Sequence, residues 1–194
     1  MIQEILLIRH GEPVPDKKTP LALRDLRAWL VEYDAGGIIP PAAPPLSLSS
    51  EELSRYFPVA SPLFRTTASL DVLGITPRAI VDELHEAVLP LFSPALLMPV
   101  KLPPMWWVTA FRLLWLAGGG KSVPSVEQVR GRAQCAAQIL SGYAQEHGAV
   151  MVMAHRIINH ALRPALEQSG WRMTEKTHNN YWGMMRFTRD APHR

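Results

Sequence analysis

Two apolar segments, each with a histidine just beyond its end, constrain the fold of this chain more than any other feature. The segment over residues 5–8 leads to Arg9 and His10, and the segment over residues 150–154 leads to His155. Short, continuously apolar segments are typical of strands that are buried on both faces of a parallel sheet. The carboxyl ends of such strands lie where α/β proteins build their sites. The sequence therefore predicts an α/β fold with both histidines at that end of the sheet.

The remaining segments predict an alternation of strands and helices. Ser61 is a candidate N-cap, Pro62 suits a first helical turn, and Gly74 is a natural helix end. The resulting order predicts a three-layer α/β/α sandwich with a mostly parallel central sheet. The further strands are expected at residues 59–61 and 181–188, and the helices at residues 21–33, 61–74 and 125–143 and after His155.

Composition favours a single domain over residues 1–194, because 47% of the residues are apolar and can form one large core. Lysine and arginine are spread along the chain without a basic run, so we expect no nucleic-acid partner. The most apolar window, residues 105–117, is short and contains Arg112, so no membrane span is expected. A single cysteine, Cys135, and an amino-terminal segment without the features of a signal peptide favour a cytoplasmic location.

Cationic and imidazole groups stand where separate elements end, and together they could hold a phosphate. Arg9 and Arg65 would supply forked, permanently charged donors for the phosphoryl oxygens. His155 would supply a further hydrogen-bond donor. His10 is the candidate nucleophile, provided that one ring nitrogen is held protonated so that the other stays free. Gly11 would let the backbone turn sharply and approach the ligand.

The leaving oxygen of a phosphate ester needs a proton, which a carboxylic acid can supply. Asp82, Glu83 and Glu86 cluster in a segment suited to this role, and we choose Glu86. The histidines lack the spacing of a metal site and no cysteine pairs accompany them, so neither a metal nor a cofactor is expected.

Several motifs resemble, in order and spacing, the phosphoglycerate-mutase-like histidine phosphatase superfamily. The resemblance implies that His10 is the covalent nucleophile and that Arg9 and Arg65 bind the phosphoryl group. It implies that His155 is the second histidine of the site and that Glu86 is the proton donor. The motifs are LLIRHGE, SPLFRTTAS, LHEA, GGKSVPSVEQVRGR and VMVMAHRIINHAL.

The chain departs from the pattern of this superfamily at three places. Arg156 replaces the glycine that usually follows the second histidine, and it is either a specificity residue or a surface charge. Lys121 stands where a glutamate is common. A hydrophobic insertion at about 88–118 replaces a glycine and a tryptophan after the acid. Its aromatic residues at a spacing of four predict one buried helix face, with a lid over an apolar substrate as the alternative; they are Trp107, Phe111 and Trp115.

Three functions fit these observations. The first is a phosphatase that hydrolyses a phosphomonoester through a phosphohistidine on His10, with a phosphorylated small molecule or phosphoprotein as substrate. The second is phosphoglycerate-mutase-type transfer, which requires water to be excluded. The third is a non-catalytic phosphate-binding or interaction module, which is suggested by the departures from the superfamily pattern at Arg156 and Lys121.

Overall fold

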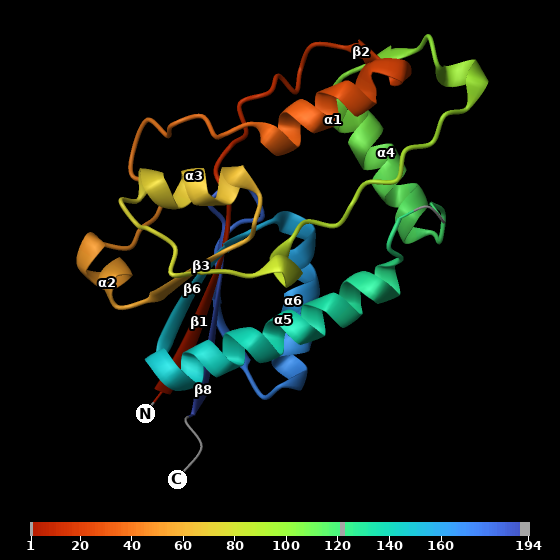
Figure 1. Ribbon diagram of the computed structural model, residues 1–194. Coiled ribbons are helices and arrows are strands. Elements are labelled where there is room, and N and C mark those ends of the chain that lie inside the picture. Colours follow the sequence, from red (N-terminus) through yellow and green to blue (C-terminus); the bar gives the residue numbers. More distant parts are fainter. Residues whose placement is uncertain (1, 121–122, 191–194) are drawn as a thin grey trace.

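The structure is a computed structural model that describes residues 2–120 and 123–190. Its centre is a six-stranded sheet with the strand order β4-β3-β6-β1-β8-β7 (Figure 1). Strands β4, β3, β6 and β1 run parallel to one another, β8 runs antiparallel to β1, and the edge strand β7 is antiparallel to β8 and so follows the direction of β1. The strands are β1 (Ile2–Arg9), β3 (Phe57–Ala60), β4 (Ala79–Ile80), β6 (Ala149–Ala154), β7 (Arg172–Lys176) and β8 (Met184–Asp190).

Helices cover both faces of this sheet, as the alternation of side chains along β1 requires. Ile5 and Leu7 point into a hydrophobic cluster shared with α5 and α6, whereas Leu6 and Ile8 point into a second cluster that includes Leu70 of α3. The predicted three-layer α/β/α sandwich with a mostly parallel sheet is therefore confirmed. The helices of these layers are α2 (Ser50–Ser54), α3 (Phe64–Val72), α5 (Val126–His147) and α6 (Arg156–Gln168).

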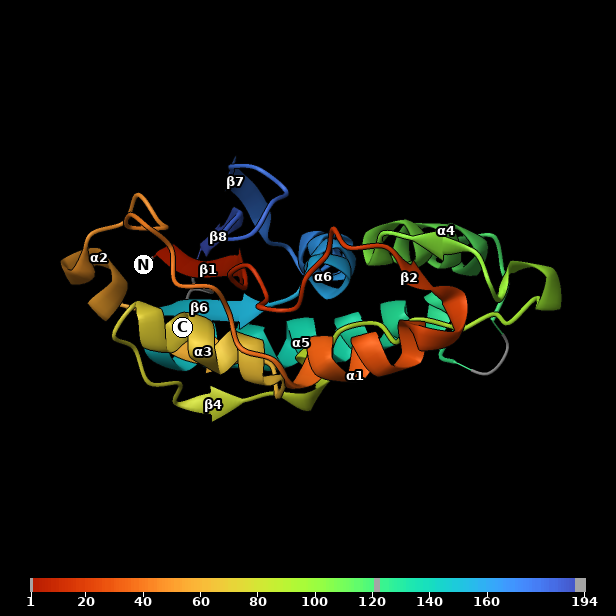
Figure 2. The same ribbon diagram turned by 90° about the horizontal axis from the view of Figure 1, so that it is seen from above.

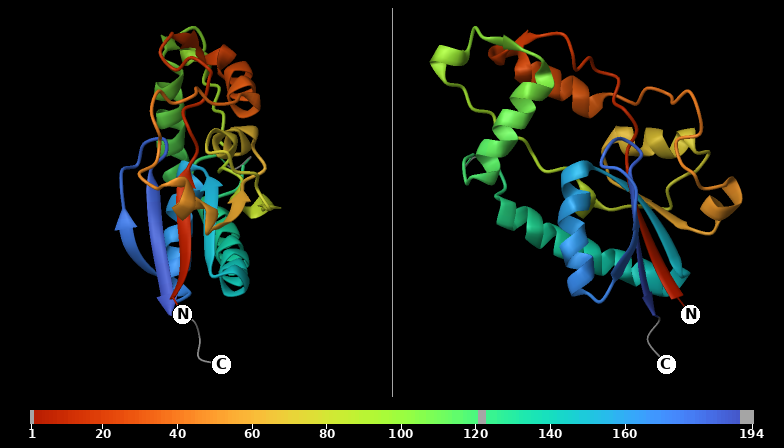
Figure 3. Two further views of the ribbon diagram at one scale, coloured as in Figure 1. Left: turned by 90° about the vertical axis from the view of Figure 1, so that its left-hand side faces the viewer. Right: turned by 180° about the vertical axis from the view of Figure 1, so that it is seen from behind.

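A further pair of helices, α1 (Leu26–Ala35) and α4 (Pro104–Leu116), lies beyond the carboxyl end of the sheet. Figure 2 shows the two helices on the same side of the molecule, and Figure 3 shows them above the strands. They share a cluster of buried residues separate from those on the sheet, and the short strands β2 (Leu21–Ala22) and β5 (Lys101–Leu102) pair beside it. Trp107, Phe111 and Trp115 are buried, as their spacing predicts.

Several element boundaries differ from the predicted ones. The helix expected from residue 21 begins at Leu26, because residues 21–22 pair as a strand and Leu23–Asp25 form a 3-10 turn. The next helix begins at Phe64, and Ser61 is not its N-cap because the Ser61 hydroxyl bonds the ring of His155. The closing strand is shifted to Met184–Asp190. None of the helices in the described part of the chain is long and apolar enough to cross a membrane.

Candidate active site

The two histidines that follow β1 and β6 are neighbours, because these strands pair in parallel and in register. Arg9 pairs with Ala154, and the His10 N–H donates to the Ala154 carbonyl at 3.0 Å. The ring centroids of His10 and His155 lie 5.0 Å apart. The sheet therefore brings together the two groups that the sequence places 145 residues apart in the chain.

His10 is held in the form that nucleophilic attack requires. Its ring is only 3% exposed, and Nδ1 donates to the Gly11 carbonyl at 2.7 Å, which leaves Nε2 unprotonated in the neutral ring. Burial, together with the positive charges of Arg65 and Arg9, lowers the pKa of His10 to about 3, although the Gly11 hydrogen bond acts in the opposite direction. His10 is thus neutral at physiological pH.

Gly11 is required at its position by packing. A Cβ atom there would lie 2.7 Å from the Trp182 ring and 2.8 Å from Ile38, closer than side chains approach one another. The Gly11 N–H donates to the Ser69 hydroxyl at 2.9 Å. These contacts fix the backbone immediately after His10 and so orient its ring.

Arg65 is almost fully buried, at 2% exposure, in the first turn of α3. Its Nη1 donates to Asp34 Oδ1 at 2.9 Å, and its guanidinium carbon lies 5.1 Å from the centroid of the Tyr33 ring. Its Nε–H is buried and has no hydrogen-bond partner among the described residues. A buried guanidinium with an unused donor is suited to an anion from outside the chain.

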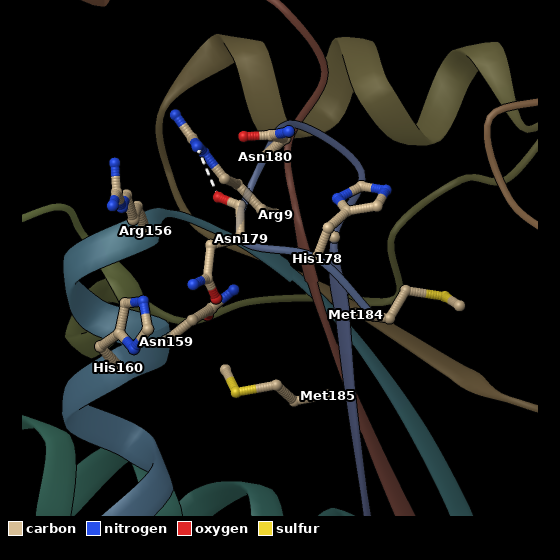
Figure 4. A pocket seen from close by; sticks show the side chains of 10 residues that line it. Arg9, Arg156, Asn159, His160, His178, Asn179, Asn180, Met184 and Met185 are labelled. Carbon is tan, nitrogen blue, oxygen red and sulfur yellow. Dashed lines mark hydrogen bonds between the residues drawn. The ribbon is translucent and has the colours of Figure 1, made fainter. Parts of the chain in front are cut away.

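Arg9 has a similar arrangement of contacts. Its Nη1 donates to the Asn179 carbonyl at 2.9 Å (Figure 4). The guanidinium carbon lies 4.1 Å from the centroid of the Tyr181 ring. Burial lowers the pKa of Arg9 from its ordinary value. Its Nε is also buried and has no partner in the described part of the chain.

His155 is completely buried behind His10 and does not line the cleft described below. Its Nε2 is hydrogen-bonded to Ser61 Oγ at 2.8 Å, whereas Nδ1 is buried and has no partner within residues 2–120 and 123–190. Burial, together with the charge of Arg65, lowers the pKa of His155 well below its ordinary value. His155 is therefore neutral, and one of its ring nitrogens is unused.

Glu86 caps the start of α6. Its oxygens accept hydrogen bonds from the N–H groups of Ala87 at 2.9 Å and of Ile157 and Ile158 at 3.2 Å each. These last two are free backbone donors of a helix start, where a carboxylate is stabilising. The structure thus places Glu86 in the cleft wall, but with both oxygens occupied as acceptors.

Arg156 is exposed at the first position of α6 and borders two cavities. The smaller one, shown in Figure 4, lies between α6 and residues 178–185, with Arg9 and Asn159 in its wall. Its volume of about 20 Å³ is enough for a water molecule and too small for a substrate.

The larger cavity is a cleft of about 800 Å³ at the carboxyl end of the sheet. Arg9, His10 and Arg65 line it on the side of the sheet, Glu86 and Arg156 lie in its wall, and residues of α1 and α4 form much of the remainder. Sites for small organic molecules typically have volumes of roughly 300–1,000 Å³, so this cleft is large enough to hold one.

Lys121 lies outside the described residues. Among those described, no three metal-ligating side chains come together to hold an ion.

No protein-family profile matches the sequence, and no curated protein matches it either. Solved structures do match. They include the open reading frame Rv3214 of Mycobacterium tuberculosis, with 19% identity, a TM-score of 0.55, and coverage of 86% of this chain and 84% of the other. Mycobacterial hydrolase 2 has 15% identity and a TM-score of 0.51, over 99% of this chain and 84% of the other. Phosphoserine phosphatase from Entamoeba histolytica has 11% identity and a TM-score of 0.51, over 94% and 89%.

These neighbours have the phosphoglycerate-mutase-like architecture of the histidine phosphatases. This chain has the histidine phosphatase fold. The expected resemblance therefore holds for the fold, although identities of 11–19% say nothing about the substrate.

Within this histidine phosphatase fold, the sequence alone did not identify four side chains near the site. Tyr33 and Asp34 come from α1 and contact Arg65, whereas Tyr181 contacts both Arg9 and Lys17, whose Nζ lies 4.8 Å from the Tyr181 ring centroid. Lys17 also forms an ion pair with Glu12. Apart from the local pair of Lys17 with Glu12, these contacts join distant parts of the chain, so no local motif predicts them.

Proposed function

We propose that the chain is a phosphatase that hydrolyses a phosphomonoester through a phosphohistidine on His10. The observation that carries this proposal is the condition of His10, which is buried and neutral with Nδ1 bonded to the Gly11 carbonyl. Nε2 is then the free nucleophile, and Arg9 and Arg65 are the adjacent cations for the phosphoryl oxygens. The phosphatase name of one structural neighbour is consistent with this proposal.

The reaction has two steps. In the first, the Nε2 lone pair of His10 attacks phosphorus, the bond from phosphorus to the alcohol oxygen breaks, and that oxygen takes a proton from an acid in the cleft. In the second, a water oxygen attacks phosphorus, the bond to Nε2 breaks, and orthophosphate leaves while the proton of the water returns to the acid. Arg9 and Arg65 neutralise the phosphoryl charge throughout.

Glu86 is our candidate for the acid, because it lies in the wall of the cleft that His10 lines. Its oxygens accept three backbone hydrogen bonds in this structure, two on Oε1 and one on Oε2, which leaves one lone-pair position on Oε2 for the proton. His155 is proposed as the second histidine at the phosphoryl group; because it is buried behind His10 in this structure, contact with the phosphoryl oxygens requires its ring to turn toward the cleft.

A test of the proposal is rapid quenching after mixing with a labelled phosphomonoester. We expect an acid-labile adduct in the native chain and none in His10→Ala. His178→Ala is the matched control, because His178 is an exposed histidine outside the cleft. Equal labelling of the native chain and His10→Ala would overturn the proposal.

The occupied oxygens of Glu86 favour one alternative, a module that binds phosphate without turnover. In that case orthophosphate would bind, measured by calorimetry, and His10→Ala or Arg65→Ala would weaken the binding. No ester would be hydrolysed above the rate in buffer. Hydrolysis that depends on His10 excludes the alternative.

A further inference from the structure

The walls of the cleft beyond the phosphoryl site are largely apolar. Val108, Leu113 and Leu116 of α4 line the cleft, and Val129 of α5 and Ile157 of α6 line it as well. The apolar surface is therefore continuous with the side on which Arg9, His10 and Arg65 lie.

Part of this apolar wall is exposed in the unliganded chain. Leu113 is 62% exposed and Leu116 is 56% exposed, although both line the cleft. Covering such side chains with an apolar ligand removes their surface from water, which is the main source of affinity in sites of this kind.

The polar side chains that α4 contributes to this wall are already bonded to the protein. The Arg112 guanidinium donates to the carbonyls of Ala87 at 3.0 Å and Val88 at 3.4 Å, and the Thr109 hydroxyl donates to the Met105 carbonyl at 2.7 Å. Groups engaged in this way are poorly placed to bind the hydroxyls of a polyol. An alcohol part rich in hydroxyls that lies against α4 would therefore lose its hydration without compensation from this helix.

We infer that the substrate is a phosphomonoester of an apolar alcohol with a single alkyl or aryl group. This inference rests on the proposed phosphatase function. The phosphate binds between Arg9, His10 and Arg65, and the apolar group lies against α4 and the first turn of α5. Two cations near the cleft, Arg27 and Arg130, add to its attraction for the anionic end of such a molecule.

The first experiment measures kcat/KM for ethyl, butyl and octyl phosphate, with glycerol phosphate as the polar counterpart of butyl phosphate. The leaving groups are all alkyl alcohols, so differences in rate report mainly on binding. We expect kcat/KM to rise at least about tenfold from ethyl to octyl phosphate, since one methylene in an apolar pocket is worth about tenfold or more. Equal values for butyl and glycerol phosphate would overturn the inference and leave the proposed function intact.

A pair of double variants tests the wall itself. Leu113→Gln with Leu116→Gln should lower kcat/KM for octyl phosphate by about tenfold and leave glycerol phosphate unchanged. The matched control is Trp106→Gln with Leu114→Gln, on the same helix, where the side chains are 68% and 50% exposed but do not line the cleft. All four positions are exposed, so none of the changes disturbs the core. An equal effect of both double variants would contradict the inference.

Binding of phosphonates, which cannot be hydrolysed, separates the two proposals. If no ester is turned over, the proposed function fails, and calorimetry with methyl- and octylphosphonate then tests the cleft alone. Affinity that does not rise with chain length would overturn the inference as well. Hydrolysis restricted to phosphatidic acid in phosphatidylcholine vesicles, with none of dissolved octyl phosphate, would replace the single-chain substrate by a membrane lipid and so also count against it.

Discussion

His10 illustrates how the surroundings of one side chain prepare it for its proposed role. Burial and the charges of Arg65, Arg9 and Lys17 all oppose protonation of the ring, while the Gly11 carbonyl fixes which nitrogen carries the proton. The same cations would attract a phosphoryl dianion. A single arrangement of charge therefore keeps the nucleophile neutral and favours binding of its target.

The low pKa of His10 predicts that the chain loses stability in mild acid. In the unfolded chain a histidine takes up its proton near pH 6.5, whereas in the folded chain the pKa of His10 is about 3. The contribution of the neutral His10 ring to the unfolding free energy is fully present above pH 6.5 and is lost as the pH falls toward 3. At a pH of about 5 the loss from this residue is about 2 kcal/mol of unfolding free energy.

Urea denaturation at a series of pH values measures this effect. His10→Asn, which cannot take up the proton in either state, should show a shallower fall in the unfolding free energy between about pH 6.5 and about pH 4. His155 should also lower the unfolding free energy as the pH falls, because its pKa in the folded chain is lowered as well. Identical slopes in the native chain and His10→Asn would show that His10 is protonated in the folded state.

Glu86→Gln distinguishes a proton donor from a helix cap. If Glu86 protonates the leaving oxygen, kcat for an alkyl phosphate should fall by about 100-fold or more, whereas nitrophenyl phosphate, whose leaving group needs no proton, should be affected by less than about tenfold. A residue that only caps α6 would affect both substrates equally. Thermal denaturation provides the control, because loss of the charge at the helix start should cost only about 0.5–1 kcal/mol in either case.

At the scale of elements, the sequence predicts those strands whose residues are buried on both faces. Residues 5–8 and 150–154 are fully buried and continuously apolar, and both are strands. β7, with the sequence RMTEK, is largely exposed at the sheet edge and has no apolar signal, and β4 is only two residues long. Their pairing with β8 and β3 depends on the assembled sheet, so the residues alone could not reveal them.

The same limit applies to the site. Arg9, His10, Arg65 and His155 follow strands or begin helices that local patterns predict, and the fold brings them together. The contact of Asp34 with Arg65 depends instead on where α1 packs, which no local pattern determines.

The start of α5 provides a prediction about a single element. Ser125 and Gln128 form a capping box, in which each side chain accepts from the backbone N–H of the other residue. Ser125→Ala should lower the unfolding free energy by about 1 kcal/mol, because backbone donors of the first turn lose their partner. Gln134→Ala, at an exposed position within the same helix, is the control and should be neutral or slightly stabilising. A neutral Ser125→Ala would mean that water replaces the cap without cost.

The described part of the molecule has four buried clusters. Two large clusters lie on the faces of the sheet, and a third joins α1 to α4 beyond its carboxyl end. The small fourth cluster contains Trp115 of α4 and Val129 of α5. The proposed nucleophile follows a strand of the sheet, whereas Asp34, which bonds Arg65, and the α4 part of the apolar wall belong to the helix pair. The cleft lies between these parts, so its shape depends on how firmly the helix pair is held.

This division predicts that the helix pair can be loosened without unfolding the sheet. Phe111 is buried between α1 and α4 and packs edge-on against Phe92 at 5.3 Å between ring centroids. Phe111→Ala should therefore accelerate amide hydrogen exchange in α1 and α4 and leave β1 and β6 protected. Phe187→Ala, within the sheet cluster, should accelerate exchange in β1 as well. Because Asp34 bonds Arg65, the first variant should also raise KM for a phosphomonoester. Uniform acceleration across the chain in Phe111→Ala would instead mean that both parts unfold as one cooperative unit.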